Sequence, residues 1–148
     1  MISDPHFNSV TNLQVEAAII QFPLTVPLQT SLLDALSLIT QTKNSCAAYI
    51  CSLPNEDGIF PDTDTSCILV TENQKLLGIL TERDIVRLSA QGYALQGIAV
   101  EEVMTTDIIT ISASKLTDFF VPLQQFRQHH IRHLPVVDES GNLQGLIS

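Results

Sequence analysis

Thr81 and Asp84 are the residues of this sequence whose types and spacing are best suited to chemistry. They follow an apolar run, residues 76–80, and open an amphipathic segment. This order predicts a strand, a tight corner and a helix N-terminus, where backbone N–H groups lack intrahelical acceptors. A hydroxyl and a carboxylate three residues apart form a capping box, in which Thr81 caps the helix and Asp84 bonds back to its N–H. The same pair would also suit a small polar ligand.

Metal and nucleophilic chemistry have less support. His129 and His133 have an i, i+4 spacing, but Pro135 and the strand pattern around it place His133 outside the helix. No acid or cysteine completes a ligand set, and no cysteine or serine has a recognisable base partner. We therefore expect no metal site and no catalysis in this segment. The cysteines lack paired spacing, which indicates reduced thiols; they are Cys46, Cys51 and Cys67.

The charge balance limits the classes of ligand. The 148 residues carry 16 acids against 7 lysines and arginines, a formal net charge of −9, whereas nucleic-acid binding needs a basic surface. Arg83 and Arg87 flank Asp84, so an anion site would be local, built from one or two arginines and a helix N-terminus. No apolar run approaches the roughly 18–20 residues of a membrane span, and no secretion signal begins the sequence. We expect a cytoplasmic protein that binds no nucleic acid.

Two strands and a helix are expected to position the Thr81–Asp84 pair. The apolar stretches 67–71 and 76–80 predict strands joined by a polar turn at residues 72–75. The helix from Thr81 is expected to run to about Ala90 and to end at Gln91-Gly92, because glycine commonly ends helices.

Three elements are expected upstream. Residues 15–20 predict a short apolar helix, and residues 24–26, between two prolines, predict a short strand. Ser31-x-x-Asp34 is a second capping box that opens a helix. The apolar face of this helix is expected to consist of Leu32, Leu33, Leu36 and Ile39.

The pattern then occurs a second time, which indicates an internal repeat. Residues 136–148 align without gaps on residues 69–81, at an offset of 67. Residues 100–111 align on residues 15–26, at an offset of 85. The difference of 18 residues indicates an insertion in the first repeat, where an acidic, turn-rich stretch lies at about 52–66.

The second repeat differs from the first in its helix, expected over residues 116–129. Pro122 lies inside it, where proline removes a backbone bond and clashes with the carbonyl of Asp118, so we expect a kink or a new helix start there. The chain also ends at Ser148, directly after the last strand, which suggests a piece of a longer protein. The expected apolar face of this helix is Leu116, Phe119, Phe120, Leu123 and Phe126.

Residues 76–84 and 132–138, with Val103–Thr105 upstream, resemble a tandem pair of cystathionine-β-synthase (CBS) domains. The resemblance implies an α+β fold of two β-α-β-β-α repeats, related by a pseudo-twofold axis, with their sheets packed face to face. The implied parts are an N-terminal arm (1–14), the first repeat (15–92), a connector (93–99) and a second repeat (100–148) that lacks its last helix.

Many such pairs bind adenosine-containing ligands in the clefts between repeats. The family pattern Gly-x-x-Thr/Ser-x-x-Asp falls on Gly78, Thr81 and Asp84. By resemblance, Asp84 would accept hydrogen bonds from both ribose hydroxyls, and Thr81 would face phosphate with Arg83 as counter-charge. Gly78 would let the backbone approach the ligand. The implied lining of the adenine slot is Thr25, Val26, Ser66, Cys67 and Ile68.

The second copy of the pattern is incomplete. Only Gly145 and Ser148 match, because the expected acid would fall beyond the last residue. His133 and Pro135 would border that cleft. Arg132 has two equally weighted interpretations, as a phosphate ligand or as a solvated residue before a strand. The first site is therefore the better candidate.

The resemblance implies a regulatory module rather than an enzyme. We expect it to bind AMP, ADP, ATP or S-adenosylmethionine, to require no cofactor, and to form a homodimer. It would control an effector domain on the same chain, as CBS pairs do in bacterial signalling proteins such as sensor histidine kinases. The alternative is a dimerisation module with an empty or vestigial cleft, favoured by the incomplete second motif and the few basic residues.

Overall fold

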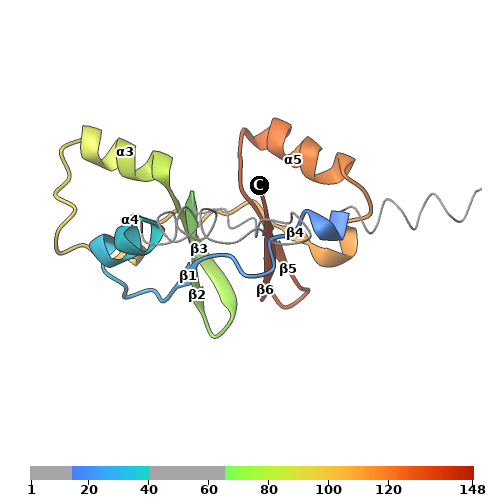
Figure 1. Ribbon diagram of the computed structural model, residues 1–148, viewed down its shortest axis with the longest axis horizontal. Coiled ribbons are helices and arrows are strands. Elements are labelled where there is room, and N and C mark those ends of the chain that lie inside the picture. Colours follow the sequence, from blue (N-terminus) through green and yellow to red (C-terminus); the bar gives the residue numbers. More distant parts are fainter. Residues whose placement is uncertain (1–14, 41–65) are drawn as a thin grey trace, which may run out of the picture. The chain divides into compact units, whose positions relative to one another are not determined.

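The computed structural model describes residues 15–40 and 66–148, which form two compact units, each with its own three-stranded sheet (Figure 1). The first unit contains described residues of the ranges 23–73 and 77–108, and the second contains those of 1–22, 74–76 and 109–148. The predicted α+β fold with two small sheets is confirmed. The face-to-face packing of the sheets stays a prediction. The expected arm and insertion lie outside the described residues.

The first sheet has the order β1-β2-β3. Its strands are β1 (Thr25–Val26), β2 (Cys67–Glu72) and β3 (Lys75–Thr81), and β1 runs parallel to β2. Asn73 and Gln74 join β2 to β3 with φ angles of 50° and 71°, and a type I′ hairpin turn needs positive φ at both central residues. The predicted strands are confirmed, with ends that differ by one residue.

The core of the first unit lies between this sheet and the helix at residues 32–40. Ser31 caps the helix by accepting a hydrogen bond from the N–H of Asp34 at 3.1 Å, as predicted. Leu33 is 42% exposed, so its expected place on the apolar face is wrong, because it lies about 100° around the helix from Leu32. The buried helical residues are Leu32, Ala35 and Ile39.

A segment from the second half of the sequence completes the first unit. Helix α4 (Val100–Val103) places Val100, which is fully buried, in the core of this unit. Thr105, just after α4, pairs with Ile79 of β3 through two backbone hydrogen bonds of 2.9 and 3.0 Å. The short helix of the second sequence repeat therefore belongs to the sheet of the first.

The second unit makes the reciprocal exchange. Val15, in the short helical stretch at residues 15–17, is 1% exposed and lies in the core of the second unit. Ile20 pairs with Leu146 through two backbone hydrogen bonds of 2.8 and 3.0 Å. Each unit therefore takes its short helix, and the extended residues after it, from the other half of the sequence.

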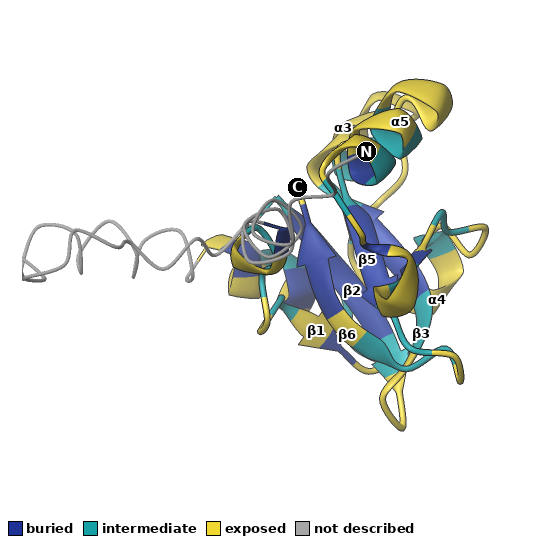
Figure 2. Cartoon of the chain, turned by 90° about the vertical axis from the view of Figure 1, so that its right-hand side faces the viewer, coloured by how far each residue is buried: buried dark blue, intermediate teal, exposed yellow. Residues whose placement is uncertain are grey.

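The second sheet has the order β4-β5-β6. Its strands are β4 (Ile111–Ser112), β5 (Leu134–Val137) and β6 (Leu143–Ile147), with β4 parallel and β6 antiparallel to β5. The buried residues of both sheets are visible in Figure 2. Val137 pairs with Leu143 whereas Val136 pairs with Gly145, which leaves Gln144 as one extra residue in β6.

The predicted gapless alignment is wrong in β5, because the second hairpin is one residue longer than the first between equivalent core positions. Leu80 and Ile147 hold equivalent core positions 67 residues apart, as predicted. In the neighbouring strands, however, the core residue Val70 pairs with Val26, and the core residue Val136 pairs with Ile111. Val70 and Val136 are 66 residues apart. A shift of one residue moves a strand's side chains to the opposite face, so core position rather than sequence identity decides the alignment.

Asp138 orders the loop between β5 and β6. Its Oδ1 accepts hydrogen bonds from the backbone N–H groups of Ser140 and Asn142, both at 2.9 Å. These bonds favour the ionised carboxyl, and they hold the pKa of Asp138 below its ordinary value, with the Asn142 N–H as the largest cause.

The helix of the second repeat begins at Phe120. A 3-10 turn, η1 (Ala113–Lys115), precedes helix α5 (Phe120–His129), and Oδ1 of Asp118 accepts from the N–H groups of Phe120 and Val121 at 2.8 and 3.3 Å. The predicted new start is confirmed, because Pro122 lies in the first turn, where its missing N–H donor removes no helical hydrogen bond.

The expected apolar face of this helix is only partly correct. Leu116 is buried in the core of the second unit, and Phe126 packs against it. The other three expected residues face solvent, because the helix starts later than the pattern predicted. Their exposed fractions are 39% for Phe119, 79% for Phe120 and 50% for Leu123.

Candidate functional site

Thr81 and Asp84 form the predicted capping box at the start of α3 (Glu82–Ala90). Oδ2 of Asp84 accepts from both the N–H and the hydroxyl of Thr81, each at 2.9 Å, and the Thr81 hydroxyl accepts from the N–H of Asp84 at 3.3 Å. Asp84 is only 8% exposed. The helix ends as expected, with Gln91 as C-cap and a φ of +79° at Gly92.

Arg87 holds the other oxygen of the Asp84 carboxylate. Its Nη2 donates to Oδ1 at 3.0 Å, and its side chain is 62% exposed while that of Asp84 is 12% exposed. Sequence reasoning named Arg83, which is exposed on the same helix, as the counter-charge for phosphate and counted Arg87 only among the local arginines, without its bond to Asp84. The i, i+3 spacing of Asp84 and Arg87 was the signal that could have found the pair.

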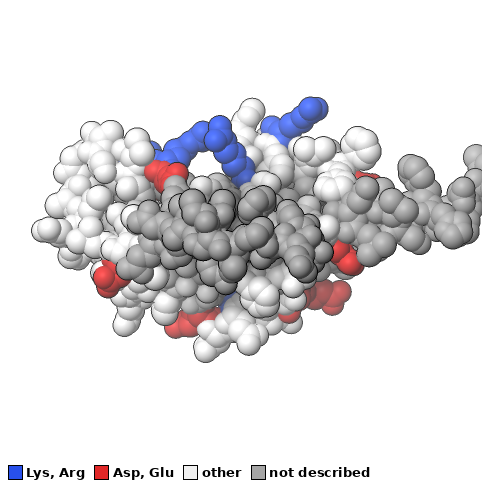
Figure 3. Space-filling view, viewed as in Figure 1, with Lys and Arg blue, Asp and Glu red and all other residues white. Residues whose placement is uncertain are grey.

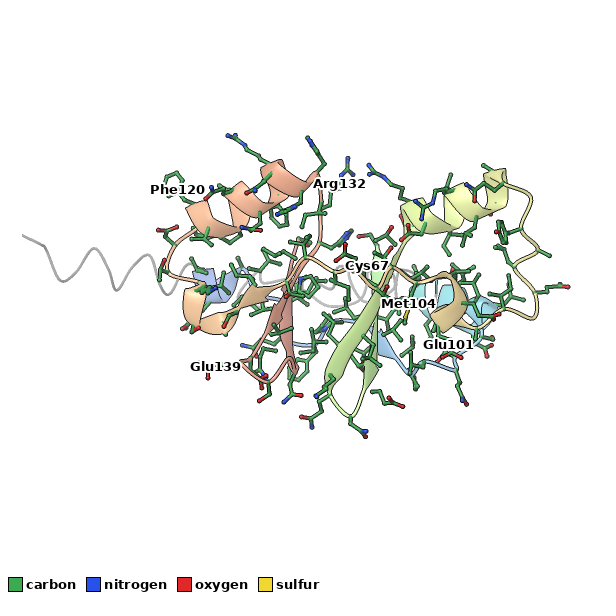
Figure 4. The ribbon with its side chains drawn as sticks, turned by 180° about the vertical axis from the view of Figure 1, so that it is seen from behind. Cys67, Glu101, Met104, Phe120, Arg132 and Glu139 are labelled. Carbon is green, nitrogen blue, oxygen red and sulfur yellow. The ribbon has the colours of Figure 1, made fainter. Side chains whose placement is uncertain are left out.

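Gly78 is required by packing within the first unit. A Cβ at this position would overlap Sδ of Met104 and lie 2.7 Å from its Cγ, and Figure 4 shows Met104 next to β3. Gly145 is equivalent in the second unit, where a Cβ would overlap Cγ2 of Ile19 and lie 2.9 Å from the carbonyl oxygen of Ile20. The contact with Met104 alone accounts for glycine at 78, and its predicted role beside a ligand stays a prediction.

We expect Gly78→Ala to lower the free energy of unfolding by about 1–3 kcal/mol, the usual range for an overpacked core. Adding Met104→Ala should recover much of the loss, because the obstructing atoms belong to a flexible side chain. The equivalent pair, Gly145→Ala with Ile19→Ala, should recover less, since the Ile20 carbonyl remains. Urea denaturation of the variants measures these differences, and equal recovery in both pairs would contradict this account.

The expected adenine-slot residues all lie in the first unit. Val26, Cys67 and Ile68 are 3%, 1% and 0% exposed, and Val26 and Ile68 belong to the core. Their side chains are therefore occupied by packing, and they would line a slot mainly through their backbone. Thr25 is exposed. The carbonyl of Ser66 accepts from the N–H of Glu82 at 3.1 Å, which brings the start of β2 to the start of α3.

The residues expected at the second site lie in the second unit. His133 directly precedes β5 and is half-buried, Pro135 is buried within β5, and Ser148 is exposed after β6. Arg132 is exposed and carries its side chain away from β5 (Figure 4). Among the described residues, no group of three or more histidine, cysteine, aspartate or glutamate side chains could hold a metal ion.

On the unit that contains α3, Figure 3 shows lysine or arginine atoms beside acidic atoms near the position of that helix. Local arginines can therefore offset the net charge of −9. No helix within the described ranges has the length and apolar character needed to cross a membrane.

Residues 15–91 and 100–148 both match the sequence pattern of the CBS domain. The chain belongs to the CBS domain family. An inosine-5′-monophosphate dehydrogenase of Nitrosopumilus maritimus is 36% identical to this CBS protein over 88 residues, or 59% of the chain. The chain spans only 17% of the length of that relative.

Solved structures agree with this assignment. A putative signal-transduction protein with CBS domains from Burkholderia ambifaria superposes with a TM-score of 0.62 at 28% identity, over 87% of this chain and 78% of that one. The CBS domain pair of protein MJ0100, solved with 5′-methylthioadenosine and S-adenosyl-L-methionine, has a TM-score of 0.66 at 19% identity, over 90% and 91% of the two chains. This second likeness shows the fold alone.

Proposed function

We propose that this CBS protein is a regulatory module that binds an adenosine-containing nucleotide at the start of α3 and passes its occupancy to a downstream signalling domain. The observation that carries the proposal is the Asp84 carboxylate. The Asp84 side chain is 12% exposed and is fixed at a helix N-terminus by Thr81. The chain belongs to the CBS domain family, and its fold neighbour MJ0100 was solved with adenosyl ligands.

The local chemistry suits a ribose and a small anion. A carboxylate can accept from two vicinal hydroxyls, and the positive end of the α3 dipole favours an anion. The N–H groups of Glu82 and Asp84 already donate to the Ser66 carbonyl and the Thr81 hydroxyl, so the dipole rather than these N–H groups would act on the anion. Glu82 and Asp84 are both acidic and lie in the first turn of α3, which opposes a highly charged group. A nucleoside or a monophosphate therefore fits better than ATP, with Gly78, Arg83 and the backbone near Thr25 as proposed neighbours.

The alternative function is dimerisation with an empty or vestigial nucleotide site. Exposed apolar side chains on two helices favour it. Val86 on α3 is 68% exposed and Phe120 on α5 is 79% exposed, and Figure 4 shows Phe120 pointing away from the body of its unit. Dimerisation by itself is compatible with nucleotide binding, so the two proposals differ in whether the nucleotide site is occupied.

A thermal-shift panel of adenosine, AMP, ADP, ATP and S-adenosylmethionine tests the proposal, with GMP as a matched control for the base. A ligand at about 100 times its dissociation constant should stabilise the fold by roughly 2.7 kcal/mol, or roughly 5–10 °C in Tm for a chain of this size. A shift with adenine compounds and none with GMP is expected. If no adenosyl compound shifts Tm while sedimentation shows a dimer, the alternative function is the better one.

A further inference from the structure

The ion pair between Asp84 and Arg87 occupies part of the proposed site. A carboxylate offers about four acceptor positions. Thr81 fills both positions on Oδ2, with its N–H and its hydroxyl at 2.9 Å each, and Arg87 Nη2 fills one on Oδ1 at 3.0 Å. One position remains, whereas the diol of a ribose brings two donors. Both hydroxyls can bind Asp84 only after Arg87 leaves or the cap of α3 breaks.

Arg87 is the partner that can leave. Its side chain is 62% exposed, whereas that of Asp84 is 12% exposed, so water can solvate the guanidinium as soon as it leaves the carboxylate. The cap, in contrast, fixes the backbone at the start of α3. Arg83 lies one turn before Arg87, on the same face of the helix. A guanidinium displaced from Asp84 would therefore share one helix face with a second arginine, which lies one turn nearer the helix N-terminus.

We infer that Arg87 is a specificity-determining residue, which holds Asp84 in the free protein and moves to a ligand phosphate when a ribose takes its place. The inference rests on the adenosine site proposed above. It makes the module selective for phosphorylated over uncharged nucleosides, because only a phosphate offers the displaced guanidinium a new anionic partner. Arg87 competes with uncharged nucleosides for Asp84, whereas it contacts the phosphate of phosphorylated nucleosides.

Isothermal titration of the full chain with adenosine and with AMP tests the inference. Arg87→Gln removes the guanidinium and leaves the cap intact. We expect adenosine to bind about two- to fivefold more tightly to this variant, since a weak competitor is gone. AMP should bind no more tightly, because its phosphate loses a partner, so the preference for AMP shrinks. Arg87→Lys, which keeps the charge but lacks the planar fork, should give an intermediate ratio.

Lys115→Gln is the control for net charge, since Lys115 is exposed and lies in the second unit. Its ratio of adenosine to AMP affinity should equal that of the wild type. An unchanged ratio in Arg87→Gln would overturn the inference and leave the proposed function intact. If neither adenosine nor AMP binds to the wild type or to Arg87→Gln, the proposed function is overturned as well. If adenosine binds to Arg87→Gln and not to the wild type, the inference is supported in its strongest form.

Discussion

Cutting the chain in its connector, between Gln96 and Gly97, is expected to leave two fragments that are unfolded when separate and that fold when mixed. Each unit takes its short helix from the other half of the sequence, so each fragment lacks part of its own core. The first fragment lacks Val100, and the second lacks Val15, which are 0% and 1% exposed in the intact chain. Burial of one valine side chain contributes about 1.5–3 kcal/mol.

The backbone losses add to this effect. Without Thr105 the N–H and carbonyl of Ile79 lose their partners, and without Ile20 those of Leu146 do. Unpaired strand edges also invite aggregation. The second fragment has about 50 residues, a length at which a single core is marginal. Against a total stability of about 5–15 kcal/mol, these losses should abolish cooperative folding of either fragment.

Circular dichroism and two-dimensional NMR of each fragment, alone and mixed, measure this effect. The control is a full chain with a protease site in the connector, cut after folding, which should keep the native spectrum. Cooperative unfolding of either fragment on its own would show that the exchanged segments are dispensable. The repeat bounds expected from the sequence, 15–92 and 100–148, would then also be independent folding units.

Asp84→Ala is expected to abolish nucleotide binding while the fold survives. A hydrogen bond to a charged group contributes about 1.5–3 kcal/mol, so the loss of two ribose contacts should weaken binding by roughly 100-fold or more. The fold should lose about 0.5–2 kcal/mol, the usual effect of losing a cap. Calorimetric titration and urea denaturation of the same sample separate the two effects.

Asp84→Asn is the matched variant for the charge. The amide oxygen can still accept from the N–H of Thr81, so the cap should be largely retained, but one ribose hydroxyl would meet an NH2 donor. We expect near wild-type stability and strongly weakened binding. Wild-type affinity in Asp84→Asn would show that the carboxylate is not the ribose acceptor. Global unfolding of both variants would show that capping is the main role of Asp84.

Much of the candidate site could be predicted because capping is a local property. The hydroxyl of Thr81 and the carboxylate of Asp84 lie in one turn of helix, and their bonds follow from a spacing of three residues. The role of Arg87 is also local, yet it was overlooked, since an exposed arginine has many rotamers and sequence does not choose among them. The prediction for Leu33 is wrong because the predicted apolar face includes one residue more than the face that is buried.

Local sequence patterns predict the order of strands and helices, the cap of α3 and the presence of two copies of one pattern. These follow from periodicity and from spacings of a few residues. Other features arise only when distant segments meet in the fold. Met104 requires a glycine at 78, Ile20 pairs with Leu146, and Gln144 adds a residue to β6. These features depend on contacts between segments far apart in the chain, and no local pattern specifies which segments will meet.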